Sequence, residues 1–128
     1  MKGVCKVGKN VPISPNPRWT YSPAVRRGNL LFISGLTGVT EETGGDIAAQ
    51  TEVIFRKMKA LLEEAGATFD NVVWTTDYMT TLEGYPGTAD VRRKYLPSDA
   101  LPAATGVVVK RLIREEALIE IDAVAVLD

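Results

Sequence analysis

Two carboxylates near the C-terminus, Glu120 and Asp122, are the residues of this sequence best suited to acid–base chemistry. They alternate with aliphatic residues in the segment 117–127, which predicts a β-strand with both carboxylates on one face. Because the rest of that face is aliphatic, burial and mutual repulsion would disfavour their ionisation. A carboxyl group kept partly neutral at about pH 7 can act as both general acid and general base.

A structural role is the alternative for these carboxylates. Acidic residues on an antiparallel strand usually face solvent or pair with a basic residue across the ladder. Lys110 and Arg111, on the preceding predicted strand, are candidates for such pairs. Spacing alone does not choose between a catalytic carboxylate and a structural ion pair.

The absence of histidine from all 128 residues restricts the possible chemistry. It excludes a Ser-His-Asp triad, a Cys-His dyad and imidazole as a metal ligand or general base. The single cysteine, Cys5, cannot form a disulfide within the chain or a site with several thiolates. We therefore expect proton transfer to depend on carboxylates, Tyr, Lys or ordered water, and we expect no metal.

Charge is unevenly distributed along the chain, although the net charge is only −1. Residues 1–40 contain six basic residues and no acidic residue. Basic segments can bind RNA or anionic metabolites, but nucleic-acid surfaces usually interleave basic residues with stacking aromatics. Here Trp19 and Tyr21 lie close to only one basic residue, Arg18. We therefore expect solvated basic side chains and no nucleic-acid partner.

Apolar runs in the sequence are short. None approaches the roughly 20 residues that a membrane-spanning helix needs, and residues 1–10 lack the apolar centre of a signal peptide. We therefore expect a cytoplasmic protein that makes no membrane contact.

The elements that would position these residues follow from hydrophobic periodicity and turn residues. Apolar residues recur every three or four positions over residues 47–65, with Lys57 and Lys59 facing elsewhere, which predicts a helix capped by Asp46 and ended by Gly66. Strands are predicted at 21–27, 30–35, 71–80, 104–112 and 117–127, a second helix at 84–95, an extended loop at 11–17 and a turn at 113–116. This order predicts one α+β domain over residues 1–128, a mixed β-sheet with two α-helices packed on one face.

Several motifs resemble, in order, those of the Rid/YjgF/YER057c family, the reactive-intermediate deaminases formerly called L-PSP endoribonucleases. The segment 27–35 (RGNLLFISG) is similar to the family's G-N-x-hydrophobic-S-G stretch. Further matches are residues 46–51 (DIAAQT), 62–66 (LEEAG), 72–76 (VVWTT) and 119–126 (IEIDAVAV). The resemblance implies a chorismate-mutase-like subunit of a homotrimer with pockets at the subunit interfaces. It also implies hydrolysis of enamines or imines to a keto compound and ammonia, without a cofactor.

The resemblance implies roles for individual residues as well. Glu120 matches the glutamate that activates water, and Tyr21 matches the tyrosine of the pocket. Ser34 and Gly35 match the S-G segment, which shapes the substrate site.

The segment 102–106 (PAATG) departs from the family pattern. By position, Ala104, Thr105 and Gly106 would line the substrate site, but Ala104 stands where the family has the arginine that holds the substrate carboxylate. Gly106 replaces a common cysteine, and Ala89 replaces an asparagine of the second helix. An absent guanidinium removes charge-assisted hydrogen bonds worth roughly 1.5–3 kcal/mol each.

Without this arginine, the sequence does not identify the chemical class of the substrate. Arg18 or Arg26 could substitute for it, or the pocket could take a neutral or larger substrate. We therefore expect a small-molecule substrate or ligand and two possible functions. One is an enamine or imine hydrolase (deaminase) of altered specificity, with water activated by Glu120, and the other is a non-catalytic small-molecule-binding or regulatory member of the family.

Overall fold

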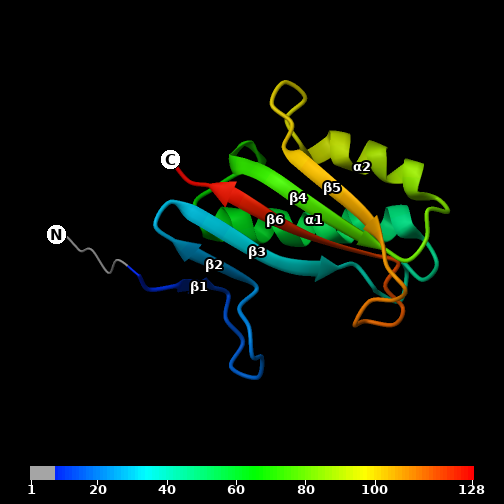
Figure 1. Ribbon diagram of the computed structural model, residues 1–128, viewed down its shortest axis with the longest axis horizontal. Coiled ribbons are helices and arrows are strands. Elements are labelled where there is room, and N and C mark those ends of the chain that lie inside the picture. Colours follow the sequence, from blue (N-terminus) through cyan, green and yellow to red (C-terminus); the bar gives the residue numbers. More distant parts are fainter. Residues whose placement is uncertain (1–7) are drawn as a thin grey trace.

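A six-stranded mixed β-sheet with two α-helices on one face forms the protein in a computed structural model that describes residues 8–128 (Figure 1). The strands are β1 (Val11–Ile13), β2 (Ala24–Arg27), β3 (Leu30–Thr37), β4 (Val72–Met79), β5 (Ala103–Val108) and β6 (Ile119–Val126), and the helices are α1 (Ile47–Glu64) and α2 (Thr88–Tyr95). Across the sheet the order is β1-β2-β3-β6-β4-β5, with β4 and β5 parallel to each other. The predicted fold class is confirmed. Cys5 lies outside the described residues.

The hydrophobic core lies between α1 and the sheet. Residues of β6 alternate as period two predicts, and the members facing α1 are all buried: Ile119, Ile121, Ala123 and Ala125. They share the core with the apolar stripe of α1, namely Ile54, Phe55, Met58 and Leu62. Since β6 lies between β3 and β4, Glu120 and Asp122 project from the middle of the sheet, on the face turned away from α1.

Both ends of α1 follow the predicted signals. The Asp46 side chain accepts a hydrogen bond from the Ala49 N–H at 3.0 Å and so caps the first turn. Ala65 ends the helix, and Gly66 follows with φ of +78°, a left-handed conformation that favours glycine. Within residues 8–128, no helix combines the length and the apolarity needed to cross a bilayer.

Two segments at the edges of the sheet differ from the sequence predictions. Val11–Ile13, predicted as part of an extended loop, forms the edge strand β1 and pairs with β2. An edge strand tolerates Pro12, which has no N–H to donate to a ladder. The strand predicted over 104–112 ends at Val108 because its partner β4 ends at Met79, the residue that pairs with Val108.

Two other elements begin later in the sequence than predicted. The strand predicted over 21–27 begins at Ala24, so Tyr21 lies in the preceding loop. The helix predicted from residue 84 starts as the 3₁₀ turn Tyr85–Gly87 and becomes α-helical only at Thr88. Pro86 is tolerated in this first turn, where a backbone N–H would have no partner within the helix.

Candidate functional site

Glu120 projects onto the open face of the sheet from the central strand. Its cross-strand partners are Thr37 on β3 and Tyr78 on β4. The carboxylate lies directly over Gly35, because a Cβ added to that glycine would be 2.1 Å from Glu120 Oε2. This conformation of Glu120 therefore requires glycine at position 35, and it places the carboxylate against the backbone of the S-G segment.

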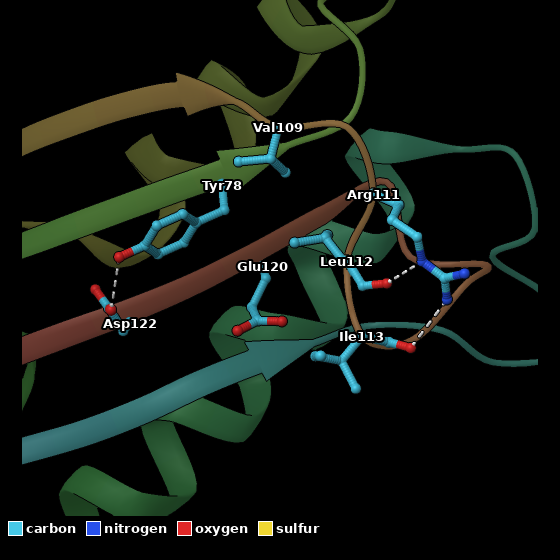
Figure 2. A pocket seen from close by; sticks show the side chains of 7 residues that line it. All are labelled: Tyr78, Val109, Arg111, Leu112, Ile113, Glu120 and Asp122. Carbon is cyan, nitrogen blue, oxygen red and sulfur yellow. Dashed lines mark hydrogen bonds between the residues drawn. The ribbon is translucent and has the colours of Figure 1, made fainter.

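The surroundings of Glu120 favour its protonated form. Partial burial, and after it the negative charge of Asp122, raises the pKa of Glu120 above its ordinary value of 4.5. The Tyr78 hydroxyl donates a hydrogen bond to Asp122 Oδ2 at 3.3 Å (Figure 2). Of the two carboxylates, Asp122 is therefore the one that accepts a hydrogen bond from Tyr78. The negative charge of Asp122 in turn raises the pKa of Tyr78. A carboxyl group with a raised pKa exchanges protons closer to neutral pH.

The ion pairs considered as an alternative for these carboxylates are not formed. β4 lies between β5 and β6, so the segment that carries Lys110 and Arg111 is not paired with β6, although Arg111 lines a cavity together with Glu120 and Asp122. The Arg111 guanidinium instead donates to the carbonyl oxygens of Leu112 at 3.1 Å and Ile113 at 3.4 Å (Figure 2). In the part of the chain that the structure describes, no salt bridge involves Glu120 or Asp122.

Two cavities meet at Glu120. The smaller, of about 450 Å³, lies between Tyr78, Asp122 and the loop after β5 (Figure 2). The larger, of about 870 Å³, extends from Glu120 past the end of β3 to α1. Both volumes lie within the range of small-molecule sites, roughly 300–1,000 Å³. We take the larger cavity as the candidate site because predicted site residues besides Glu120 line it.

Four predicted site residues line the larger cavity together: Tyr21, Ser34, Gly35 and Glu120. The Ser34 hydroxyl donates to the Ser22 carbonyl at 2.7 Å, so it holds the loop that carries Tyr21. The Tyr21 ring stacks on Trp19, with centroids 5.2 Å apart, and both rings are exposed. Trp19 also lines the cavity. Sequence reasoning considered it only for nucleic-acid stacking, although its spacing of two residues from Tyr21 was the available signal.

The three predicted site residues on β5 lie away from the Glu120 cavities. Ala104, Thr105 and Gly106 are exposed on this edge strand and do not line either cavity at Glu120. Gly106 is close to the end of β4 and to the 3₁₀ turn before α2, since a Cβ there would lie 3.3 Å from Met79 Cε and 3.9 Å from the Tyr85 hydroxyl. One copy of the chain therefore does not bring these residues together with Glu120.

Lys57 is a cavity residue that the sequence did not reveal. Helical periodicity placed it away from the core, on the polar side of α1, and it does lie outside the core. Its amine reaches the end of β3 and donates to the Thr37 carbonyl at 2.7 Å, where it lines the same cavity as Glu120. Burial, and after it the positive charge of Arg114, lowers the pKa of Lys57.

The mixed sheet, its two helices and a carboxylate facing a cavity define a small α+β protein with a candidate site at its central strand. The sequence profile of the family described as Endoribonuclease L-PSP matches residues 12–127. The chain belongs to this family, which also carries the names YjgF and Rid, and the resemblance of its motifs is confirmed.

Relatives and solved structures agree on this assignment. The chain is 37% identical over 116 residues to a RutC family protein of Pyrococcus abyssi, and the matched region covers 88% of this chain and 90% of the relative. It is 30% identical over 123 residues to a Dermatophagoides farinae protein named 2-iminobutanoate/2-iminopropanoate deaminase, covering 93% and 94%. The structure of a YjgF/YER057c/UK114 family member from Mycobacterium tuberculosis superposes with a TM-score of 0.80 at 32% identity, covering 93% of this chain and all of the other.

Proposed function

We propose that this protein hydrolyses the C=N bond of a small imine, or of an enamine through its imine tautomer, and releases ammonia. The position of Glu120 carries the proposal, because its carboxylate lies against Gly35 in a cavity that Tyr21 and Ser34 also line. The deaminase name of the Dermatophagoides farinae relative supports the class of reaction. The proposal does not name the imine, because Ala104 stands where the resemblance to the family implies an arginine that holds the substrate carboxylate.

The chemistry needs one group that both accepts and donates a proton. Ionised Glu120 takes a proton from a water molecule as the water oxygen bonds to the imine carbon, and it delivers that proton to the imine nitrogen, which gives a carbinolamine. Glu120 then takes the hydroxyl proton of the carbinolamine and passes it to the amine nitrogen. The C–N bond breaks as the C=O bond forms, so that imine and water become a carbonyl compound and ammonia and Glu120 is again ionised. The raised pKa of Glu120 suits both steps at neutral pH.

A homotrimer would complete the site, and we include it in the proposal. The open face of the sheet exposes large apolar side chains, with Phe32 46% and Trp74 51% exposed, as at surfaces that bind other subunits. Ala104 and Gly106 on the exposed strand β5 would then line the Glu120 cavity of a neighbouring copy. Light scattering should give a mass of about three times 13.9 kDa. A fully active monomer would contradict this assembly.

Ammonia release from imines made in place by an amino-acid oxidase tests the reaction. The panel should contain imines with and without a carboxylate, and the wild type is expected to accelerate the hydrolysis of at least one of them above the buffer rate. Hydrolysis at the buffer rate for every imine would overturn the proposed reaction.

Restoring the family's arginine is expected to raise activity on 2-iminopropanoate. Ala104→Arg supplies a bidentate partner for the substrate carboxylate, which should raise kcat/KM by roughly tenfold or more. Ala100→Arg adds the same charge on an exposed turn and serves as the control. An equal response of the two variants would show that position 104 does not face the substrate.

A non-catalytic, ligand-binding role is the second candidate, and alanine at position 104 favours it. In that case small carboxylates or imines would raise the melting temperature without product formation. A thermal-shift screen run beside the ammonia assay separates the two functions.

Replacing Gly35 with alanine is expected to impair turnover while leaving the fold intact. The new Cβ would meet the tip of Glu120, which can rotate away, so the carboxylate moves and the backbone does not. Misplacing a catalytic group should lower kcat/KM by roughly 10- to 100-fold. Gly44→Ala is the matched control, because a Cβ there meets nothing within 4 Å. Unchanged kcat/KM in Gly35→Ala would contradict the placement of Glu120.

A further inference from the structure

The outer edge of β3 is open next to Glu120. β2 pairs with β3 only as far as Ile33, whose partner is Ala24. Beyond that point β3 continues to Thr37, and the Lys57 amine approaches this edge from α1 to donate to the Thr37 carbonyl. The larger cavity runs along the same edge, from the sheet face to the side of α1.

Lys57 and Glu120 both adjoin Thr37, Lys57 from the side of α1 and Glu120 from the neighbouring strand β6. Thr37 is the cross-strand partner of Glu120 and also accepts the hydrogen bond from Lys57. Both side chains line the larger cavity. An ammonium group has three N–H donors, so two remain for a ligand after Thr37 has taken one.

A second cation lies at the same end of the cavity. Arg114 lines it and is close enough to lower the pKa of Lys57. Its salt bridge to Glu116, at 3.0 Å, joins two exposed side chains, and pairs of this kind are weak. The acidic residue at this end, Glu64, already accepts hydrogen bonds from the backbone and hydroxyl of Ser14.

We propose that Lys57, assisted by Arg114, binds the carboxylate of the substrate in place of the arginine that is absent at position 104. The substrate is then a small imine that carries a carboxylate, and Glu120 acts on its C=N carbon. This inference rests on the proposed function for the reaction, but the anion site itself can be measured without turnover.

Binding of pyruvate and 2-oxobutanoate, the keto acids that correspond to two such imines, tests the anion site by calorimetry. We expect Lys57→Gln, which removes the charge and keeps a hydrogen-bond donor, to weaken binding by about tenfold or more. Lys57→Arg should restore most of the affinity. Lys59→Gln, an exposed neighbour on the same helix, should change it less than about twofold. Methyl pyruvate, which has no charge, should bind the wild type and Lys57→Gln alike.

Each outcome decides the inference. A wild type that binds neither keto acid, or a Lys57→Gln variant with unchanged affinity for both, would overturn it. If Lys57→Gln lost equal affinity for pyruvate and for methyl pyruvate, the inference would also be overturned, because the loss would then come from a change of cavity shape and not from the missing charge. If imines are not hydrolysed but keto acids still bind through Lys57, the proposed reaction fails and the anion site stands. If hydrolysis proceeds with unchanged KM in Lys57→Gln, the reaction stands and the anion site fails.

Discussion

Replacing Glu120 with glutamine is expected to lower kcat/KM for imine hydrolysis by about 10²- to 10⁴-fold, the range that general acid–base catalysis contributes. Glutamine has the shape of glutamate, so it can occupy the same position over Gly35. Its amide cannot accept and return a proton, and therefore neither step of the hydrolysis retains its proton carrier. Ammonia release by the purified variant, compared with the wild type at several imine concentrations, measures the loss.

A control at another glutamate separates this effect from a general loss of negative charge. Glu83 is exposed in the loop after β4, so Glu83→Gln should retain wild-type kcat/KM. A Glu120→Gln variant with more than a tenth of wild-type activity would exclude Glu120 as the main proton carrier and leave another carboxylate, Tyr, Lys or ordered water as the remaining routes.

The same variant carries a signature in stability, because the pKa of Glu120 is raised in the folded protein. Below about pH 4 the carboxyl group is protonated in both folded and unfolded chains, so wild type and Glu120→Gln should melt alike. As the pH rises through the raised pKa, the folded wild type must hold a disfavoured charge and loses stability, which the variant does not. Melting temperatures measured from acid to neutral pH should therefore diverge in favour of Glu120→Gln. A constant difference across this range would mean that Glu120 titrates normally.

Local sequence patterns predicted the fold well because each depends on near neighbours. The alternation along β6 identified the buried row and the face that carries Glu120, and the cap and stop signals of α1 identified its ends. The position of β6 in the sheet is a long-range property. Lys110 and Arg111 are candidate cross-strand partners of the carboxylates from the sequence alone, because consecutive strands are usually neighbours. In the structure β4 pairs with both β5 and β6 and so lies between them.

The cavity was only partly predictable for the same reason. Tyr21, Ser34 and Gly35 were identified through the resemblance to the family, and the structure places them beside Glu120. Lys57 was not identified, because helical periodicity reports only that a side chain faces away from the core. Its contact with Thr37 depends on where the pairing between β2 and β3 stops, and no local pattern encodes that point.

Loss of the Arg92 guanidinium is expected to destabilise the protein strongly. Its guanidinium pairs with Asp77, a carboxylate that is only 2% exposed, and the Tyr85 hydroxyl donates to the same carboxylate at 2.9 Å. Arg92→Met leaves this charge buried without its counterion, which costs about 3–5 kcal/mol in the free energy of unfolding. Since domains are stable by only about 5–15 kcal/mol, chemical denaturation should show a large fall in the midpoint.

The neighbouring residue on α2 provides the matched control. Arg93 pairs with Asp90, but both side chains are exposed, so Arg93→Met should cost less than about 1 kcal/mol. Adding Asp77→Asn to Arg92→Met removes the unpaired charge and should recover part of the stability. Equal, small losses for Arg92→Met and Arg93→Met would contradict a buried ion pair. The pair also bears on the site, because it fixes the Tyr85 hydroxyl beside Gly106. A destabilised α2 should therefore disturb the strand that the proposed trimer contributes to the neighbouring cavity.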